Sequence, residues 1–200
     1  PFQISDDNGV YMFRNIEAIV NDYFAVSIQG SGNYIVGNGC TNEDITVSWA
    51  ISIKNFGNLP DSFDVTFDTS DAVAAAWTVT GADDENTGNV LPKAEQGTFT
   101  LNFDITVPGE LAAGTTHGIT MTATSEGDSS QTQTQEFSAT VEQCYGISMT
   151  VDKTTDSADP GAAADYTVTV TNTGNGDDTV SYMTMGASTW NPTLSETSST

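Results

Sequence analysis

Three acidic loops hold the residues of this sequence that are best suited to binding a metal ion. They cover residues 6–8, 83–86 and 177–178. Ca²⁺ takes about six to eight oxygen ligands, and carboxylates supply such oxygens. None of the loops has the twelve-residue calcium-loop spacing with its central Gly and final Glu. The best candidates for a Ca²⁺ site are therefore Asp83, Asp84 and Glu85, and the alternative is that the loops are simply solvated.

Catalytic chemistry would depend on His117, the only histidine of the chain. One histidine cannot form a multi-histidine metal site within a single chain, and any Ser/His/Asp triad would have to use it. The sequence contains no Gly-x-Ser-x-Gly nucleophile elbow, and its carboxylates are too abundant for a pair of them to indicate glycoside hydrolysis. We therefore expect a protein that is not an enzyme, with no catalytic residues and no cofactor besides the possible Ca²⁺.

The three tryptophans offer another kind of chemistry, the stacking of sugar rings. Trp49 lies within a strand-like run, and Trp77 and Trp190 occupy matching positions of an internal repeat described below. A tryptophan that recurs in register more often fills the core between two sheets. We expect core packing, and sugar stacking by exposed rings is the alternative.

The charge balance excludes whole classes of partner. The 200 residues include 4 Lys and Arg against 27 Asp and Glu, a net charge of -23. Affinity for nucleic acids and anionic lipids comes largely from Lys and Arg, so neither partner is expected. The cations Arg14, Lys54, Lys93 and Lys153 are scattered singly and form no phosphate clamp. Such a composition fits a saline setting, where salt screens the self-repulsion; an ordinary acidic secreted β-protein is the alternative.

Strand-like runs separated by Gly, Asn and Asp predict an all-β fold. The runs cover residues 44–55, 62–68, 97–107, 118–125, 133–141 and 165–172. No stretch reaches the roughly 20 apolar residues that a membrane helix needs, so no membrane insertion is expected. The first residues lack a signal-peptide pattern. Because the chain starts with Pro1, we expect that a leader was removed or that the sequence is a window on a longer protein.

An internal repeat sets the domain organisation. The kernel Asn-x-Gly-Asn-x-x-Asp occurs twice, at an offset of 117 positions, and comprises Asn55, Gly57, Asn58 and Asp61 and then Asn172, Gly174, Asn175 and Asp178. Upstream, residues 24–28 match residues 145–149 at an offset of 121. Gly and Asn accept positive φ, and Asn side chains bond nearby backbone. The kernel therefore predicts a turn whose Asp accepts backbone amides, with ligand binding as the alternative.

The repeat divides the chain into one complete and two partial units. Residues 23–143 form the complete unit, and residues 144–200 the first half of a further unit. Residues 1–22 are predicted to be the last hairpin of a preceding unit, with a turn at residues 6–9 and a strand at residues 16–20; an N-terminal strand exchanged between subunits is the alternative. Residues 10–24 also fit an amphipathic helix, but the repeat register favours the strand.

The repeated residues resemble a known superfamily. Pro160-Gly161, the strand at residues 166–170, the turn after Asn172 and Trp190 are similar to immunoglobulin-like modules of archaeal and bacterial surface proteins. Close relatives are the cell-adhesion-related CARDB modules and the β-sandwich domain found beside α-galactosidases. The resemblance implies tandem immunoglobulin-like β-sandwich domains that act as spacers, stalks, adhesion units or surface-layer blocks, and it supplies no catalytic residues.

The resemblance also implies a pairing for the two cysteines, Cys40 and Cys144. In such sandwiches the first strand often runs beside and parallel to the last, so the ends of these strands meet. Each cysteine follows one of these strands in the complete unit, so we expect a disulfide between them; two free buried thiols are the alternative. Such a bond favours an oxidising, extracellular compartment.

These observations favour a non-enzymatic structural module of an extracellular cell-surface assembly, namely a surface layer, stalk or filament of repeated units. Its partners would be neighbouring domains of the same array or further copies of itself. In one version, residues 1–22 of a neighbouring copy would complete residues 144–200. The alternative function is a carbohydrate-binding or adhesion accessory module of a larger secreted protein, with a cell-surface glycan as partner.

Overall fold

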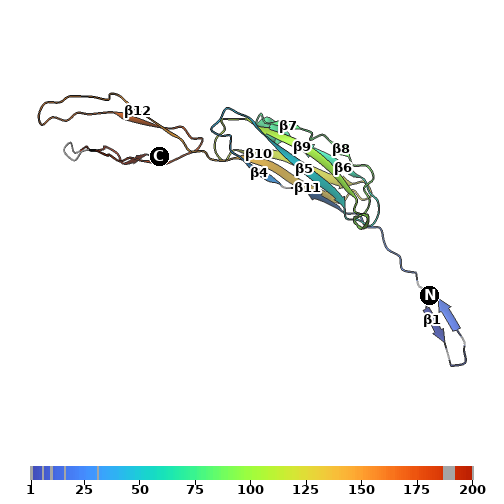
Figure 1. Ribbon diagram of the computed structural model, residues 1–200. Helices are drawn as coiled ribbons and strands as arrows, with labels where there is room; N and C mark the ends of the chain where they lie inside the picture. Colours follow the sequence, from blue (N-terminus) through green and yellow to red (C-terminus); the bar gives the residue numbers. More distant parts are fainter. Residues whose placement is uncertain are drawn as a thin grey trace.

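The computed structural model of the chain describes residues 2–5, 7–9, 11–15, 17–30, 32–186 and 192–199. The described part of the molecule is nearly all β, which confirms the prediction of an all-β fold. It is elongated, with a hairpin at its N-terminal end, a sandwich in the middle and two hairpins at its C-terminal end (Figure 1). We call residues 23–143 the central sandwich and residues 144–199 the C-terminal segment. None of the helices in the described residues has the length and apolar character needed to span a membrane.

Two sheets pack face to face in the central sandwich. The four-stranded sheet has the order β3 (Val26–Gln29), β5 (Ile45–Asn55), β9 (Thr98–Val107) and β7 (Thr78–Thr80). The five-stranded sheet has the order β4 (Asn33–Val36), β11 (Thr132–Val141), β10 (Thr116–Ser125), β6 (Phe63–Asp68) and β8 (Glu85–Asn86). Two short helical segments, α1 (Ser70–Ala74) and η1 (Lys93–Glu95), lie in the connections.

The core lies between the two sheets because apolar residues occupy alternate positions of the long strands. In β5, every second residue from Val47 to Ile53 is buried. The ring of Phe103 in β9 stacks on Trp49, with ring centroids 5.3 Å apart, and meets Phe137 of β11 edge-on at 5.2 Å. Aromatic contacts of this kind join the two sheets and add to the burial of apolar area.

The first two strands of the sandwich belong to different sheets. β3 pairs antiparallel with β5, whereas β4, after a short connection, pairs with the last strand, β11, in parallel. Gly30 lies at this crossing, where an added Cβ would collide with Cδ1 of Ile51. Glycine at this position leaves room for the side chain of Ile51 where the chain changes sheets.

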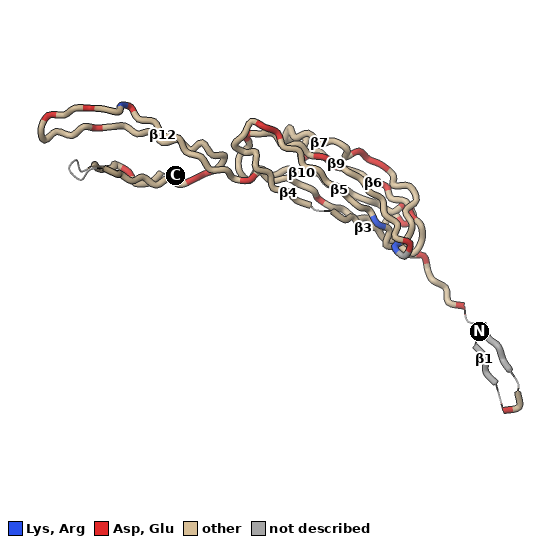
Figure 2. The backbone as a smooth tube through the Cα atoms, viewed as in Figure 1, with Lys and Arg blue, Asp and Glu red and all other residues tan. Residues whose placement is uncertain are grey.

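Charge is distributed unevenly over the central sandwich. Figure 2 shows Asp and Glu positions spread along the molecule, whereas the Lys and Arg positions of the sandwich lie at the end nearest to the N-terminal linker. The two lysines of the sandwich are Lys54 and Lys93. The Nζ atom of Lys93 lies 4.1 Å from the ring centroid of Phe56. The positive charge of the sandwich is therefore confined to one end.

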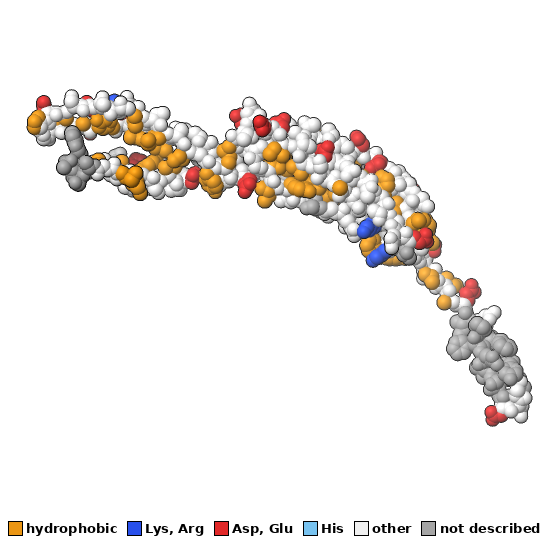
Figure 3. Space-filling view, viewed as in Figure 1, with side chains coloured by type: hydrophobic (Ala, Val, Ile, Leu, Met, Phe, Trp, Pro, Cys, Tyr) orange, Lys and Arg blue, Asp and Glu red, His pale blue; other side chains and the backbone are white. Residues whose placement is uncertain are grey.

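The C-terminal segment leaves an apolar face open. β12 (Ile147–Val151) pairs with β13 (Val168–Asn172), and β14 (Val180–Ser181) pairs with β15 (Ser198–Ser199). Within the described residues no second sheet covers the β12–β13 hairpin, and Ile147 and Met149 are 62% and 69% exposed. Apolar side chains of this segment are visible in orange at the C-terminal end of Figure 3.

The N-terminal hairpin consists of β1 (Phe2–Ser5) and β2 (Tyr11–Arg14), which pair antiparallel. The strand expected at residues 16–20 is not found in its described part, because residues 17–20 form neither strand nor helix. Ile19 and Val20 are exposed, and none of the described strands lies beside them to form a ladder of hydrogen bonds. The helix considered for residues 10–24 is likewise not formed by the described residues of that range.

Candidate functional site

A disulfide joins Cys40 to Cys144 at the boundary between the central sandwich and the C-terminal segment. Cys40 follows β4 by four positions, and Cys144 follows β11 by three. Because β4 and β11 are parallel, they end at the same edge of the sheet. This brings the two Cα atoms to 6.2 Å, within the usual range for a disulfide. The pairing is the one that the resemblance implies.

Asn38 supports the loop that carries Cys40. It is buried, and its side-chain nitrogen lies 3.1 Å from the carbonyl oxygen of Glu43 and 3.0 Å from those of Val107 and Pro108. The amide therefore fixes the loop after β4 to the end of β9. The sequence analysis missed this residue, because its partners lie up to 70 positions away and leave no local pattern.

Asn175 holds the two parts of the molecule together. Its side-chain oxygen accepts a hydrogen bond from the N–H of Cys144 at 2.8 Å, and its side-chain nitrogen donates to the carbonyl oxygens of Glu142 at 3.0 Å and Leu111 at 3.1 Å. Its own carbonyl oxygen accepts the N–H of Ala113 at 2.9 Å. Asn175 thus binds the linker and a loop of the central sandwich at once.

Small and uncharged groups complete this junction. A Cβ on Gly39 would collide with the side-chain amide of Asn175, so glycine allows the close approach. The Nε2 of Gln143 donates to a backbone carbonyl two residues beyond Asn175, at 2.8 Å. Because the hydrogen-bonding groups carry no charge, salt screens them little and pH does not titrate them.

The first copy of the kernel makes the same hydrogen bonds to the N-terminal linker. The side chain of Asn58 accepts the N–H of Tyr23 at 2.7 Å and donates to the carbonyl oxygen of Asn21 at 2.9 Å. In the second copy, Cys144 and Glu142 take these places, displaced by the repeat offset of 121 positions. Each copy of the kernel is a turn that also clamps the linker lying on it, and the sequence analysis missed the clamp.

Within each turn, the first Asn of the kernel holds the following Gly. The side-chain oxygen of Asn55 accepts the N–H of Gly57 at 2.8 Å, and that of Asn172 accepts the N–H of Gly174 at 2.8 Å. A Cβ on either glycine would meet the carbonyl oxygen of the entering linker. Neither glycine has positive φ, so the requirement is close approach of the linker and not the backbone conformation anticipated from the sequence.

The kernel's Asp has a larger role in the first copy than in the second. Asp61 and Asp178 each accept the N–H of the following residue, at 2.9 and 2.7 Å. Asp61 is buried and also accepts the N–H of Gly127 at 3.0 Å and the hydroxyl of Ser125 at 2.5 Å. It thereby ties the turn to the end of β10, a contact with no counterpart in the described part of the C-terminal segment.

The three Ca²⁺ candidates lie at and just before β8. Oδ1 of Asp84 accepts the N–H of Phe67 at 2.8 Å, and Glu85 pairs with Val65 across the β6–β8 ladder. No group of three or more His, Cys, Asp or Glu side chains within the described ranges is arranged to hold a metal ion. A Ca²⁺ site at Asp83, Asp84 and Glu85 therefore stays a prediction.

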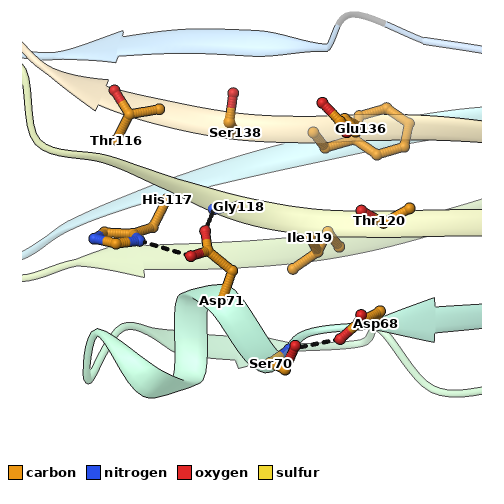
Figure 4. A pocket seen from close by; sticks show the side chains of 11 residues that line it. Asp68, Ser70, Asp71, Thr116, His117, Gly118, Ile119, Thr120, Glu136 and Ser138 are labelled. Atoms are coloured by element: carbon orange, nitrogen blue, oxygen red, sulfur yellow. Dashed lines mark hydrogen bonds and ion pairs between the residues drawn. The ribbon is translucent and has the colours of Figure 1, made fainter.

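A groove between α1 and β10 contains His117 (Figure 4). Its Nδ1 lies 3.1 Å from Oδ1 of Asp71, and the N–H of Gly118 donates to Oδ2 of Asp71 at 3.0 Å. The hydrogen bond with His117, followed by that from Gly118, lowers the pKa of Asp71. The imidazole also meets the ring of Trp77 edge-on, with centroids 5.1 Å apart. These contacts fasten α1 to β10, and both oxygens of the carboxylate take part in them.

Two of the three tryptophans are enclosed by the core. Trp49 and Trp77 are 2% and 3% exposed, so neither ring is available to stack on a sugar. The core packing expected of them is confirmed. Trp190 lies outside the described residues.

Comparisons with known proteins add no residue roles to this description. No protein-family model matches the chain, and no curated protein matches its sequence. The functional proposal therefore rests on the junction, the repeated turn and the composition.

Proposed function

We propose that this chain is a non-enzymatic structural module of an extracellular cell-surface assembly, such as a surface layer, stalk or filament, built from repeated immunoglobulin-like units. The observation that carries the proposal is the pair of clamps at Asn58 and Asn175, which bind the entering linker through the same hydrogen bonds. Units joined in series by such clamps keep a fixed spacing and angle, which is what a structural array requires.

The strand order supports an immunoglobulin-like sandwich. In that fold one sheet has the order A-B-E-D and the other contains C, F and G. In the central sandwich, β3, β5, β9 and β7 take the first set of places, and β6, β10 and β11 take the second. β4 lies beside β11 as a continuation of the first strand in the other sheet.

The register of the first strand pair supports the tandem arrangement. Val26 pairs with Asn55 between β3 and β5, and Ile147 pairs with Asn172 between β12 and β13. The two pairs are related by the same offsets, 121 and 117, as the sequence repeat. The open apolar face of the C-terminal segment corresponds to the face that β3 and β5 direct into the core, as the first half of a further unit would present it.

The covalent and ionic features favour an extracellular, saline setting. Disulfides persist mainly in oxidising compartments, and a net charge of -23 is tolerated best where salt screens the repulsion. The clamp contacts are uncharged, so the salt that screens the acidic surface leaves the junction intact. The chemistry of the junction and that of the surface therefore suit the same environment.

NMR residual dipolar couplings on the full chain test whether the junction is rigid. The proposal predicts that couplings from the central sandwich and from the C-terminal segment fit one alignment tensor. The Asn175→Ala variant under reducing conditions should need two tensors, whereas Asn102→Ala, which alters an exposed position of β9, should behave as the wild type. A wild type that needs two tensors would contradict the proposal, because a freely jointed chain sets no spacing.

A further inference from the structure

We propose that the turn at residues 55–58, together with Tyr23, is a docking surface for the end of a second unit of this same kind, namely the end that carries Cys40, Leu111 and Ala113. The inference rests on the proposed tandem repeat and adds to it a surface that lies at the opposite end of the central sandwich from the disulfide. The occupant is identified by the contacts that the equivalent turn already makes in this molecule.

The turn around Asn175 shows the docked state. There the side-chain nitrogen donates to Leu111 as well as to the linker, and the carbonyl oxygen of Asn175 accepts the N–H of Ala113. The turn around Asn58 makes only the hydrogen bonds to the linker and none to a second loop of the described residues. Its side-chain nitrogen donates to Asn21, and no described residue donates to its carbonyl oxygen.

Exposure of the two turns agrees with this difference. Asn175 is half-buried and Asn58 is exposed. Tyr23, which stands at the repeat position of Cys144, is 58% exposed. Its carbonyl oxygen accepts the N–H of Asn58 at 2.9 Å, so the linker lies on the turn in the same way at both places. The surface is therefore preformed, and only the second unit's end is missing from it.

The two ends of the sandwich differ in charge. Lys54 and Lys93, the only Lys or Arg among residues 23–143, lie beside this turn, at an end that also carries carboxylates such as that of Glu126. The loops at the opposite end of the sandwich carry Glu110 and Glu142 and neither Lys nor Arg. A head-to-tail contact would therefore bring the two lysines toward carboxylates of the docked unit.

One difference between the turns changes the fit slightly. Leu59 takes the place of Gly176, where an added Cβ would lie 3.0 Å from Cβ of Ala113. The docked loop must therefore adjust around the Leu59 side chain, which has no counterpart at the observed junction. The contact joins two different ends of the same module, so repeating it gives an open, linear array and not a closed dimer.

An extended chain tests the inference with a disulfide as the readout. In the extended chain, a second copy of residues 23–143 replaces residues 1–22; this copy contains every residue of the buried apolar cluster. Gln143 of the added copy is then followed directly by Tyr23, just as Gln143 is followed by Cys144 in the natural chain. With Tyr23→Cys in this chain, the docked geometry should form a second bridge, from Cys40 of the added copy to the introduced thiol. Peptide mapping identifies the bridge, and equilibration with glutathione gives its stability.

Matched variants separate docking from mere proximity. Asn58→Ala should lower the equilibrium constant for the new bridge by at least about fivefold, since it removes hydrogen bonds to the linker and to the docked loop. Asn102→Ala should leave it unchanged. Failure to form the bridge, or a bridge whose stability is the same with Asn58→Ala, would overturn the inference.

A second measurement does not depend on the introduced thiol. In the extended chain with Tyr23 retained, the Ala113 amides of both copies should be equally protected from hydrogen exchange, and an unprotected amide in the added copy would overturn the inference. The bridge between Cys40 and Cys144 reports in the same samples that the units are folded. If the added copy does not dock while the junction at Asn175 remains rigid, only the docking inference is overturned and the proposed function is unaffected. A flexible junction at Asn175 would contradict the proposed function itself.

Discussion

Removal of the disulfide is expected to cost the central sandwich a large part of its stability. The double variant Cys40→Ala/Cys144→Ala opens a loop that spans 104 positions. In the chain-entropy model, closing a loop of this length restricts the unfolded chain and stabilises the folded state by about 4.7 kcal/mol. Small domains have free energies of unfolding of about 5–15 kcal/mol, so the variant should lose about 30% or more of its total.

The folded structure itself should change little. The β4–β11 ladder and the hydrogen bonds of Asn175 and Asn38 hold the same segments in place without the sulfur atoms. The effect of the variant should therefore arise in the unfolded state, whose freedom increases when the loop is opened.

Urea unfolding followed by tryptophan fluorescence measures the loss, because Trp49 and Trp77 are buried in this sandwich. With a slope of about 1.5 kcal/mol/M, the midpoint should fall by about 3 M. Wild-type protein with reductant is the matched control, and its midpoint should coincide with that of the double variant. A fall below about 0.5 M in both samples would refute the view that the bridge acts on the unfolded chain.

Four further substitutions test individual contacts. Asp61→Ala should lower the free energy of unfolding by about 3 kcal/mol, because the buried hydroxyl of Ser125 and two partly buried backbone N–H groups lose their acceptor. Asp178→Ala, which affects one exposed donor, should cost under about 1 kcal/mol, and equal losses in urea unfolding would contradict this account. The pKa of Asp71 is lowered from 3.8 by His117, so its charge stabilises the fold above that value and the contribution is lost as the pH falls through the lowered pKa. The difference in urea midpoint between wild type and Asp71→Asn should therefore be larger at pH 6 than at pH 2.5, and a constant difference would argue against the contact. Trp77→Ala should cost about 3–5 kcal/mol as a core truncation; a variant of native stability in thermal unfolding would show that the ring is not part of the core.

The long strands of the sandwich were predictable because apolar and polar residues alternate along them. β5 and β9, with 11 and 10 residues, carry that alternation throughout, and β11 begins within one residue of its predicted start. The short elements α1, β4, β7 and β8 were not predicted, since two to five residues are too few to show a period. The strand expected at residues 16–20 from the repeat alignment is not formed by residues 17–20 for a different reason. A strand needs a neighbouring strand for its backbone hydrogen bonds, and the offset in sequence does not provide one.

The clamp could not be predicted from the kernel alone. The turn is encoded locally, because Asn55 and Gly57 are two positions apart. The partners of Asn175 lie 31 to 64 positions away, and two of them, Leu111 and Glu142, belong to the central sandwich, so the same Asn side chain looks like an ordinary turn residue in the sequence. The sequence did contain one signal for the clamp. Both copies of the kernel keep the second Asn, Asn58 and Asn175, although a turn alone does not require an Asn at that position.

The disulfide also decides which residues carry tension when the chain is pulled from its ends. Force that enters at Cys144 passes through the bridge to Cys40 and leaves the sandwich through β4 and β3 at Tyr23. Only the 17 positions from Tyr23 to Cys40 lie in this path, and the residues between the cysteines form a closed loop that stretching cannot extend. At about 3.5 Å per residue, forced unfolding would lengthen the oxidised unit by at most about 60 Å, against about 420 Å after reduction. The unit is in this sense a nearly inextensible link, and most of its core lies outside the line of load.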